Sequence, residues 1–248
     1  MHKVARQQHI LAILSEHKQI NISELASSMQ VSVDTIRRDL AALERQGLAQ
    51  KNHGGATALS LSVMSRKVRS MLLPNIKKSL GKAVAAQIPP GSTLILDAGS
   101  TVLEVARELK VPATVITTSL DIAQCLSERP DIRLILLGGE WHAGQRFFAG
   151  SATLSLLERY RADIAILGVC ALHQQQGISA TTETDADIQR LMLKVSDEHW
   201  LVTDHLKLDR CEPHWVAYLS QVHRIFINRP WPGMEEQSDI DICIVESE

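Results

Sequence analysis

Apolar residues recur at helical spacing three times within the first 45 residues of the chain. Residues 4–16 predict a first amphipathic helix, and Asn21 can cap a short second one. Ser32 can cap a third helix, and Gly47 offers it a left-handed end. The apolar face of the third helix would be formed by Val33, Ile36, Leu40 and Leu43. The pattern therefore predicts a small unit of three helices.

From residue 90 onward the pattern changes to short aliphatic runs that alternate with helical segments. The runs predict strands at residues 93–97, 114–118, 133–137, 163–169, 200–204, 224–228 and 241–245. The segments between them predict helices at residues 102–109, 121–127, 152–160 and 185–195. Strands and helices that alternate in this way indicate an α/β domain with a mainly parallel sheet and helices on both faces.

Residues 57–82 separate the two patterns and hold six Lys or Arg residues but no Asp or Glu. The beginning of this stretch is small and polar, which is typical of a flexible linker. A helix is predicted at residues 75–88, where apolar side chains stand four residues apart. We therefore expect a first domain at residues 1–56, a linker at residues 57–74 and the α/β domain at residues 75–248.

The composition narrows the class of protein. A length of 248 residues fits two unequal domains, and 45% hydrophobic with only 4% aromatic residues fits a soluble chain with aliphatic cores. No run approaches the ~20 apolar residues that cross a bilayer, so we expect a cytoplasmic protein without a membrane partner. The four cysteines form no C-x-x-C pair, which indicates neither a disulfide framework nor a zinc ribbon.

The net charge of −2 hides an uneven distribution. Residues 1–82 carry 13 Lys or Arg against 5 Asp or Glu, whereas residues 83–248 carry 13 against 23. A basic first part and an acidic second part are expected if only the first part meets a polyanion such as nucleic acid. The alternative is a basic face that is merely solvated.

The second and third predicted helices have the spacing of a helix-turn-helix, whose second helix enters the major groove of DNA. Arg37 and Arg38 can bind guanine or phosphate, while Thr35 can tune the choice of base. Residues 48–50 predict a strand and residues 51–55 a glycine turn, which together indicate a wing that lies along the DNA backbone or in the minor groove. The expected DNA contacts are Ser32, Asp34, Thr35, Arg37, Arg38, Arg45, Lys51 and His53. A plain three-helix bundle is the alternative.

Ligands of parallel sheets bind beyond the carboxyl ends of the strands, and four loops at those ends carry suitable groups. Hydroxyls and backbone N–H groups after the first two strands can hold an anion at a helix start. Asp204, after the fifth strand, could bind a hydroxyl, and Lys207 a phosphate. The expected ligand-binding residues are Asp97, Gly99, Ser100, Thr101, Thr118, Ser119, Gly138, Gly139, Asp204 and Lys207. Each loop taken singly could equally be a turn or a helix cap.

The first 56 residues resemble the DeoR family of bacterial repressors. The resemblance rests on Arg6, Ile10 and Leu14, on the run Ser32-Val33-Asp34-Thr35-Ile36-Arg37-Arg38-Asp39-Leu40, and on His53-Gly54-Gly55-Ala56. It implies a winged helix that binds an operator through Thr35, Arg37 and Arg38, with Lys51 and His53 near phosphate.

The second part resembles the sensor domain of the same family. The matching stretches are Asp97-Ala98-Gly99-Ser100-Thr101, Thr117-Thr118-Ser119-Leu120, Gly138-Gly139, Arg161-Ala162-Asp163 and Asp204-His205-Leu206-Lys207. The resemblance implies a fold similar to ribose-5-phosphate isomerase and glucosamine-6-phosphate deaminase, and a phosphorylated sugar or polyol as effector. The sequence departs from the family in two places. The family often has Asp-Ser-Ser-Lys-Phe-Gly where this chain has Asp-His-Leu-Lys-Leu-Asp at residues 204–209, and it often has a lysine in place of Gln189.

The sequence thus predicts a DNA-binding transcriptional regulator, a repressor of a carbohydrate catabolism operon, and no enzyme, cofactor or metal. Its expected partners are double-stranded operator DNA, a phosphorylated sugar and further copies of itself in a dimer or tetramer.

The sequence offers three alternatives to this function. A sugar-phosphate isomerase or deaminase could use Asp97, Glu183, Asp185 and Lys207. A metal could be held by His205, Cys211 and His214. RNA binding is disfavoured because residues 1–82 contain no Phe, Tyr or Trp on which bases could stack.

Overall fold

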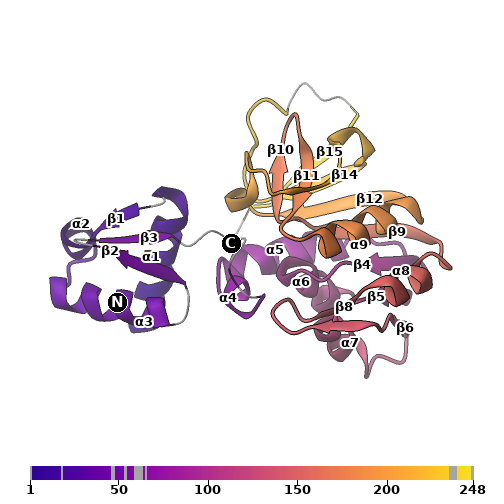
Figure 1. Cartoon of the computed structure of the whole chain (residues 1–248), viewed down its shortest axis with the longest axis horizontal. Helices are drawn as coiled ribbons and strands as arrows, with labels where there is room; N and C mark the ends of the chain where they lie inside the picture. Colours follow the sequence, from indigo (N-terminus) through magenta and orange to yellow (C-terminus); the bar gives the residue numbers. More distant parts are fainter. Residues whose placement is uncertain are drawn as a thin grey trace. The chain divides into compact units, whose positions relative to one another are not determined.

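The computed structural model describes residues 2–17, 19–45, 48–52, 55–58, 64, 66–234 and 239–246. Its chain contacts separate two units, residues 1–74 and residues 75–248 (Figure 1). The first unit is called the amino-terminal unit and the second the sheet unit.

The amino-terminal unit contains the three predicted helices and a small sheet. Its elements are α1 (Lys3–His17), β1 (Gln19–Asn21), α2 (Ile22–Ser28), α3 (Val33–Arg45), β2 (Ala49–Asn52), β3 (Gly55–Ala58) and α4 (Arg66–Ser70). The strands are antiparallel in the order β1-β3-β2. The core is aliphatic and includes Ile10, Leu14, Leu25, Ile36, Leu40 and Leu43, all of them buried. The three predicted helices are therefore confirmed. Ile36, Leu40 and Leu43 of α3 face the core as predicted, whereas Val33, expected on the same face, is 36% exposed at the first position of the helix.

The helix caps in this unit are those that the sequence predicts. The Asn21 side chain accepts a hydrogen bond from the Ser23 N–H at 2.8 Å, and Ser32 Oγ accepts one from the Thr35 N–H at 3.2 Å. Each cap satisfies an N–H group that has no partner within its helix. Gly47, the predicted end of α3, lies outside the described residues.

The wing is longer than predicted, and the helix-turn-helix is joined to it by a strand that the sequence did not reveal. Asn52 pairs with Gly55, so the expected turn at residues 51–55 is mostly strand. Gly55 is required here, because a Cβ atom would lie 2.1 Å from the Ile20 carbonyl oxygen of β1. Strand β3 runs on to Ala58, and α4 lies within the expected linker.

The sheet unit is built on seven parallel strands in the order β15-β14-β12-β9-β4-β5-β6. Their bounds are β4 (Thr93–Leu96), β5 (Ala113–Thr117), β6 (Ile132–Leu136), β9 (Ala162–Gly168), β12 (Ser196–Thr203), β14 (Arg224–Ile227) and β15 (Asp241–Ile244). All seven correspond to predicted strands. The α/β class and the parallel sheet are therefore confirmed.

Helices cover both faces of this sheet. Alternate residues of β4 show the division: Leu94 and Leu96 pack with the helices of one face, and Ile95 packs with those of the other. The first face carries α5 (Pro74–Ala85), α6 (Ser100–Glu108) and α7 (Leu120–Leu126). The second carries α8 (Ser151–Leu157) and α9 (Glu183–Lys194). Strands buried on both faces explain why the sequence shows continuous aliphatic runs.

Several short elements decorate the sheet unit and were not predicted. They are the hairpin β7 (Glu140–His142) and β8 (Phe147–Ala149), the antiparallel strands β10 (Ala171–His173), β11 (Gly177–Ala180) and β13 (His214–Ala217), and the 3-10 turns η2 (His205–Lys207) and η3 (Leu219–Gln221). Elements this short leave no pattern in the sequence unless they form the continuous aliphatic run of a buried strand. Within the described part of the chain, no helix combines the length and the apolar character needed to span a bilayer.

Candidate DNA-binding surface and ligand site

Helix α3 presents its cationic side chains to solvent. The side chain of Arg38 is 83% exposed and that of Arg37 is 63% exposed. Asp34 lies close to both: its Oδ2 is 3.4 Å from Arg38 Nη2, and its Oδ1 is 3.9 Å from Arg37 Nη1. Ion pairs this exposed contribute about 0 to 1 kcal/mol, so both guanidinium groups can exchange this carboxylate for a phosphate or a base.

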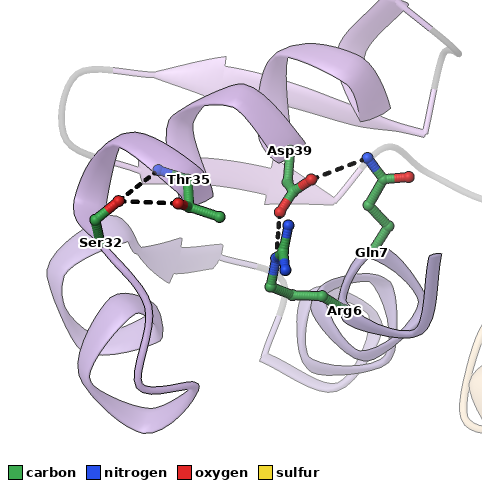
Figure 2. A network of polar contacts seen from close by, with 5 residues as sticks. All are labelled: Arg6, Gln7, Ser32, Thr35 and Asp39. Carbon is green, nitrogen blue, oxygen red and sulfur yellow. Dashed lines mark hydrogen bonds and ion pairs between the residues drawn. The ribbon is translucent and has the colours of Figure 1, made fainter. Parts of the chain in front are cut away.

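The hydroxyls at the start of α3 bond to each other. Ser32 Oγ and Thr35 Oγ1 are 2.9 Å apart, and the same Ser32 oxygen caps the helix (Figure 2). Ser32 therefore has a structural role that accounts for it without DNA. Its contact with DNA stays a prediction, as does that of Thr35.

A buried ion pair holds α3 against α1. Asp39 is 2% exposed, and its Oδ2 accepts a hydrogen bond from Arg6 Nε at 2.5 Å (Figure 2). Its Oδ1 accepts another from Gln7 Nε2 at 3.1 Å. Both donors come from α1, more than 30 positions earlier in the chain. The Asp39 carboxylate therefore positions the helix that carries Arg37 and Arg38.

The remaining expected DNA contacts are less clearly placed. Arg45 Nε donates to the Ala41 carbonyl oxygen at 3.2 Å, near the end of α3. Lys51 lies on β2, where its backbone pairs with Ala56. His53 lies outside the described residues. The DNA contacts of these three residues stay predictions.

The four predicted loops do lie at one edge of the parallel sheet, because all of them follow the carboxyl ends of strands. The chain proceeds from β4 to β5 and β6 on one side, then returns to β9 on the other side of β4. The ends of β4 and β9 thus flank the switch point at which such sheets bind ligands. Strands lie ~4.8 Å apart, so the ends of β6 and β12 are about 19 Å apart, too far for one small ligand to touch both directly.

Asp97 lies at this switch point, buried and held by three N–H donors. Its Oδ1 accepts from the Ala98 N–H at 2.7 Å. Its Oδ2 accepts from the Gly168 N–H at 3.2 Å and from Gln189 Nε2 at 2.8 Å. Burial raises the pKa of the Asp97 carboxyl to about 6; the Gln189 hydrogen bond opposes this rise, and the Asp185 charge adds to it. The site thus has a carboxyl group whose ionisation is costly.

Gln189, Gly168 and Asp185 were not among the expected ligand-binding residues. Gln189 reaches Asp97 from α9, 92 positions later in the chain. Only two signals in the sequence pointed to this region: Gln189 stands where the family often has a lysine, and Asp185 was considered for the rival enzyme. Gly168 gave no signal, since it reads as part of a strand.

The other groups after β4 are buried at the start of α6. Ser100 and Thr101 are buried, and the Gly99 N–H donates to the Asp97 carbonyl oxygen at 2.9 Å. Among the described residues, Thr101 Oγ1 has no hydrogen-bond partner. The predicted placement of these residues at the sheet edge is confirmed, and their contact with a ligand stays a prediction.

The loops after β5 and β6 have structural roles of their own. Ser119 Oγ caps α7 by accepting from the Ile122 N–H at 3.3 Å, and the Thr118 carbonyl oxygen accepts from the Phe148 N–H of β8 at 2.9 Å. A Cβ atom on Gly139 would lie 2.1 Å from Thr153 Oγ1. The Gly138 carbonyl oxygen accepts from that same hydroxyl at 2.8 Å. These residues fit the alternative reading of turns and caps.

The loop after β12 brings an ammonium group beside a buried carboxylate. Lys207 Nζ is 3.9 Å from Asp204 Oδ2, and the two side chains are 13% and 3% exposed. Asp204 Oδ1 accepts from the Leu206 N–H at 3.1 Å, so this carboxylate caps η2. Lys207 is therefore positioned by Asp204 and retains donors for an anion.

Two family models cover this chain. One, described as the DeoR-like helix-turn-helix domain, matches residues 6–61, and the other, the DeoR C terminal sensor domain, matches residues 74–229. The chain belongs to the DeoR family. The resemblance seen in the sequence is thereby confirmed.

DeoR-family relatives match over nearly the full chain. The HTH-type transcriptional repressor GlcR of Bacillus subtilis (strain 168) is 32% identical over 100% of this chain and 98% of its own length. The glycerol-3-phosphate regulon repressor of Escherichia coli (strain K12) is 31% identical over 94% of this chain and 93% of its own length. The transcriptional repressor AccR of Agrobacterium fabrum is 30% identical over 88% and 86%.

Solved structures overlap this DeoR-family chain only partly. Ribose 5-phosphate isomerase A from Methanocaldococcus jannaschii is 17% identical, with a TM-score of 0.40 over 54% of each chain.

The structure gives no support to the alternative of a metal held by His205, Cys211 and His214. His205 Nδ1 is 2.9 Å from Asn228 Nδ2, and Cys211 is exposed as a free thiol. No group of three His, Cys, Asp or Glu side chains suited to a metal ion occurs in the described ranges.

Proposed function

We propose that this DeoR-family protein is a transcriptional repressor that binds operator DNA through α3 and releases it when a phosphorylated sugar or polyol binds the sheet unit. The observation that carries the proposal is the exposed pair Arg37 and Arg38 on the second helix of a helix-turn-helix, in a chain whose relatives are named repressors. The test is selection of bound sequences from a random pool of duplexes at moderate ionic strength. Recovery of no preferred sequence would contradict the proposal.

The proposed interface uses the exposed face of α3 for the bases and the wing for the backbone. Arg37 and Arg38 donate to guanine or phosphate, and Thr35 and Asp34 adjust the preference. Ser32, Arg45, Lys51 and His53 complete the interface with phosphate contacts. Two or more copies place their amino-terminal units on repeated half-sites, which requires a homodimer or tetramer.

Replacing Arg38 by alanine is expected to weaken binding to the selected operator by about 1 to 3 kcal/mol, because Arg38 offers a base or phosphate a fork of N–H donors. Fluorescence anisotropy with a labelled operator measures the effect. Arg107→Ala is the matched control, since Arg107 forms a comparable ion pair with Glu104 on α6. Equal affinities of wild type and Arg38→Ala, with matched circular dichroism, would place the interface elsewhere.

The proposed effector site lies at the edge of the sheet where the strands end. The ends of β4 and β12 are two strand spacings apart, about 10 Å, a span that a phosphorylated hexose can bridge. In this arrangement Asp97 lies at one end of the ligand and Lys207 at the other. The name of the glycerol-3-phosphate regulon repressor supports a phosphorylated polyol or sugar as the ligand class.

Replacing Lys207 by alanine is expected to leave operator affinity unchanged and to raise the effector concentration for half-maximal release at least about tenfold, since a charged hydrogen bond contributes about 1.5 to 3 kcal/mol. Anisotropy titrations with hexose phosphates and glycerol 3-phosphate measure the release. Lys194→Ala, which removes an exposed lysine paired with Glu158, is the control. Release by Lys207→Ala at the wild-type concentration would show that Lys207 does not hold the phosphate.

We propose further that the protein is no enzyme and acts in the cytoplasm, where its DNA lies. The rival isomerase or deaminase would use Asp97, Asp185 or Glu183 as a base and Lys207 as an anchor. Relatives over nearly the full length are named as repressors, which supports the regulatory role. Conversion of ribose 5-phosphate or glucosamine 6-phosphate by the purified protein would support the rival.

A further inference from the structure

The Gln189 amide is fixed in one orientation by its neighbours. Its Nε2 donates to Asp97 Oδ2 at 2.8 Å and to the Gly168 carbonyl oxygen at 3.0 Å. Both partners are acceptors, and the amide nitrogen has two hydrogens to give them. A flipped amide would turn Oε1 toward those two acceptors and lose both bonds. The amide therefore directs Nε2 toward the strand ends and Oε1 away from them.

The Oε1 atom of this amide is buried without a hydrogen-bond partner among the described residues. Gln189 as a whole is 4% exposed. An amide oxygen only accepts hydrogen bonds, so whatever satisfies it must be a donor. Native proteins seldom leave such an atom unpaired, which indicates that a further group is bound there.

The charges near Gln189 Oε1 also favour a hydrogen-bond donor as its partner. Asp97 lies in direct contact with Gln189, and the Asp185 charge acts on Asp97. Among the described residues, the groups that shift the pKa of Asp97 include no cation. A phosphate or carboxylate here would face like charges and would give Oε1 no donor. A hydroxyl or an ammonium group would be bound by Oε1 and attracted by the carboxylates.

Asp97 can accept a further hydrogen bond from the same donor. Its Oδ1 accepts one hydrogen bond, from the Ala98 N–H, and a carboxylate oxygen can accept two. A second buried atom without a partner among the described residues, Thr101 Oγ1, lies four positions after Asp97 at the start of α6. Unpaired polar atoms thus occur on both α9 and α6.

We propose that Gln189 Oε1 and Asp97 form a subsite for a hydrogen-bond donor of the effector, a sugar hydroxyl or an amino group, and that the phosphate binds outside it. Gln189 is then a specificity-determining residue: it requires a donor at this position. The inference rests on the proposed effector class. It adds the orientation of the ligand, with its unphosphorylated end at the β4–β9 switch point.

The first experiment finds a ligand for the full-length protein. Calorimetry is carried out with glucose 6-phosphate, glucosamine 6-phosphate, sorbitol 6-phosphate, glycerol 3-phosphate and inorganic phosphate. If none of the organic phosphates binds, the proposed effector class is wrong, and the proposed subsite then has no ligand to bind. Comparison of glucosamine 6-phosphate with glucose 6-phosphate tells an ammonium group from a hydroxyl.

The second experiment tests the subsite by itself. Analogues of the tightest-binding organic phosphate, each lacking one hydroxyl or amino group, are titrated into wild type and Gln189→Leu. One analogue is expected to bind wild type about tenfold more weakly than the parent compound. The same analogue should bind Gln189→Leu within about twofold of the parent, because the acceptor is gone. Affinity for inorganic phosphate should not change.

Two further variants keep this test decisive. Gln124→Leu, an exposed glutamine on α7, should retain the wild-type discrimination. Gln189→Lys keeps a donor toward Asp97 but has no acceptor, so it should lose the discrimination as well, and it replaces Gln189→Leu if circular dichroism shows that variant to be unfolded. Identical penalties in wild type and both Gln189 variants would mean that only water binds Oε1, and would overturn the proposal. So would a changed affinity of the uncharged variant Gln189→Leu for inorganic phosphate.

Discussion

Replacing Asp39 by alanine is expected to lower the free energy of unfolding of the amino-terminal unit by about 3 to 5 kcal/mol. Asp39 is 2% exposed and binds both Arg6 and Gln7 of α1. Its removal takes the carboxylate away from a guanidinium group that is mostly buried. The Arg6 side chain is 12% exposed and so reaches some water, which places the expected loss nearer the lower figure.

The measurement can be confined to one unit. Every Trp, Tyr and Phe of the chain lies beyond residue 82, so tryptophan fluorescence reports on the sheet unit alone. Circular dichroism reports on both units. Asp39→Ala should shift only the transition that fluorescence does not detect. Asp34→Ala is the control on the same helix, with an expected loss below about 1 kcal/mol because its ion pairs are exposed. Equal shifts for the two variants would show that burial of the Arg6–Asp39 pair does not matter.

The second large effect concerns the pH dependence of the sheet unit. The pKa of the Asp97 carboxyl is raised, chiefly by burial, from 3.8 to about 6. Between pH 3.8 and about pH 6, the Asp97 carboxyl is protonated in the folded protein but ionised in the unfolded chain. The contribution of Asp97 to stability is therefore complete below about pH 4 and falls as the pH rises to about 6. One pKa unit corresponds to about 1.4 kcal/mol, so the loss amounts to about 3 kcal/mol.

Denaturant unfolding followed by tryptophan fluorescence from about pH 4 to about pH 7.5 measures this loss. The quantity to follow is the difference between wild type and Asp97→Asn, since other carboxyl groups cancel in it. Asp131→Asn is the control that should show no change over this range, because the Arg129 hydrogen bond lowers the pKa of the exposed Asp131 and its contribution to stability changes only below about pH 4. A wild-type minus Asp97→Asn difference that stays constant over this range would mean that Asp97 ionises normally in the folded protein.

The sequence predicts well those parts of the fold that show either a helical period or the continuous aliphatic run of a buried strand. The strand β9 reads as an aliphatic run because both of its faces are buried, and α3 shows a full apolar stripe over its 13 residues. Strand β1 has three residues and exists through its pairing with β3. No local pattern in the sequence predicts such a strand, because its partner strand comes more than 30 positions later.

The candidate ligand site likewise has a part that the sequence predicts and a part that it does not. Its edge of the sheet follows from the order of strands and loops, and Asp97 follows from its position after β4. The role of Gln189 depends on a contact across 92 positions, which the sequence alone does not contain. Local chemistry also misleads: Ser119 has the hydroxyl of an anion site, yet it caps α7. Hydroxyl-bearing residues and glycines occur both in anion-binding sites and in helix caps and turns, so the residue type alone does not tell the two apart.

The central pairing of the sheet has a consequence for biosynthesis. Strand β4 pairs with β9 about 70 positions later, so one edge of β4 stays open until about half of the sheet unit has been translated. The amino-terminal unit is complete within the first 74 residues and uses none of those strands. Since domains emerge from the ribosome in chain order, the helix-turn-helix domain of the nascent chain can fold before the sensor domain has been completed.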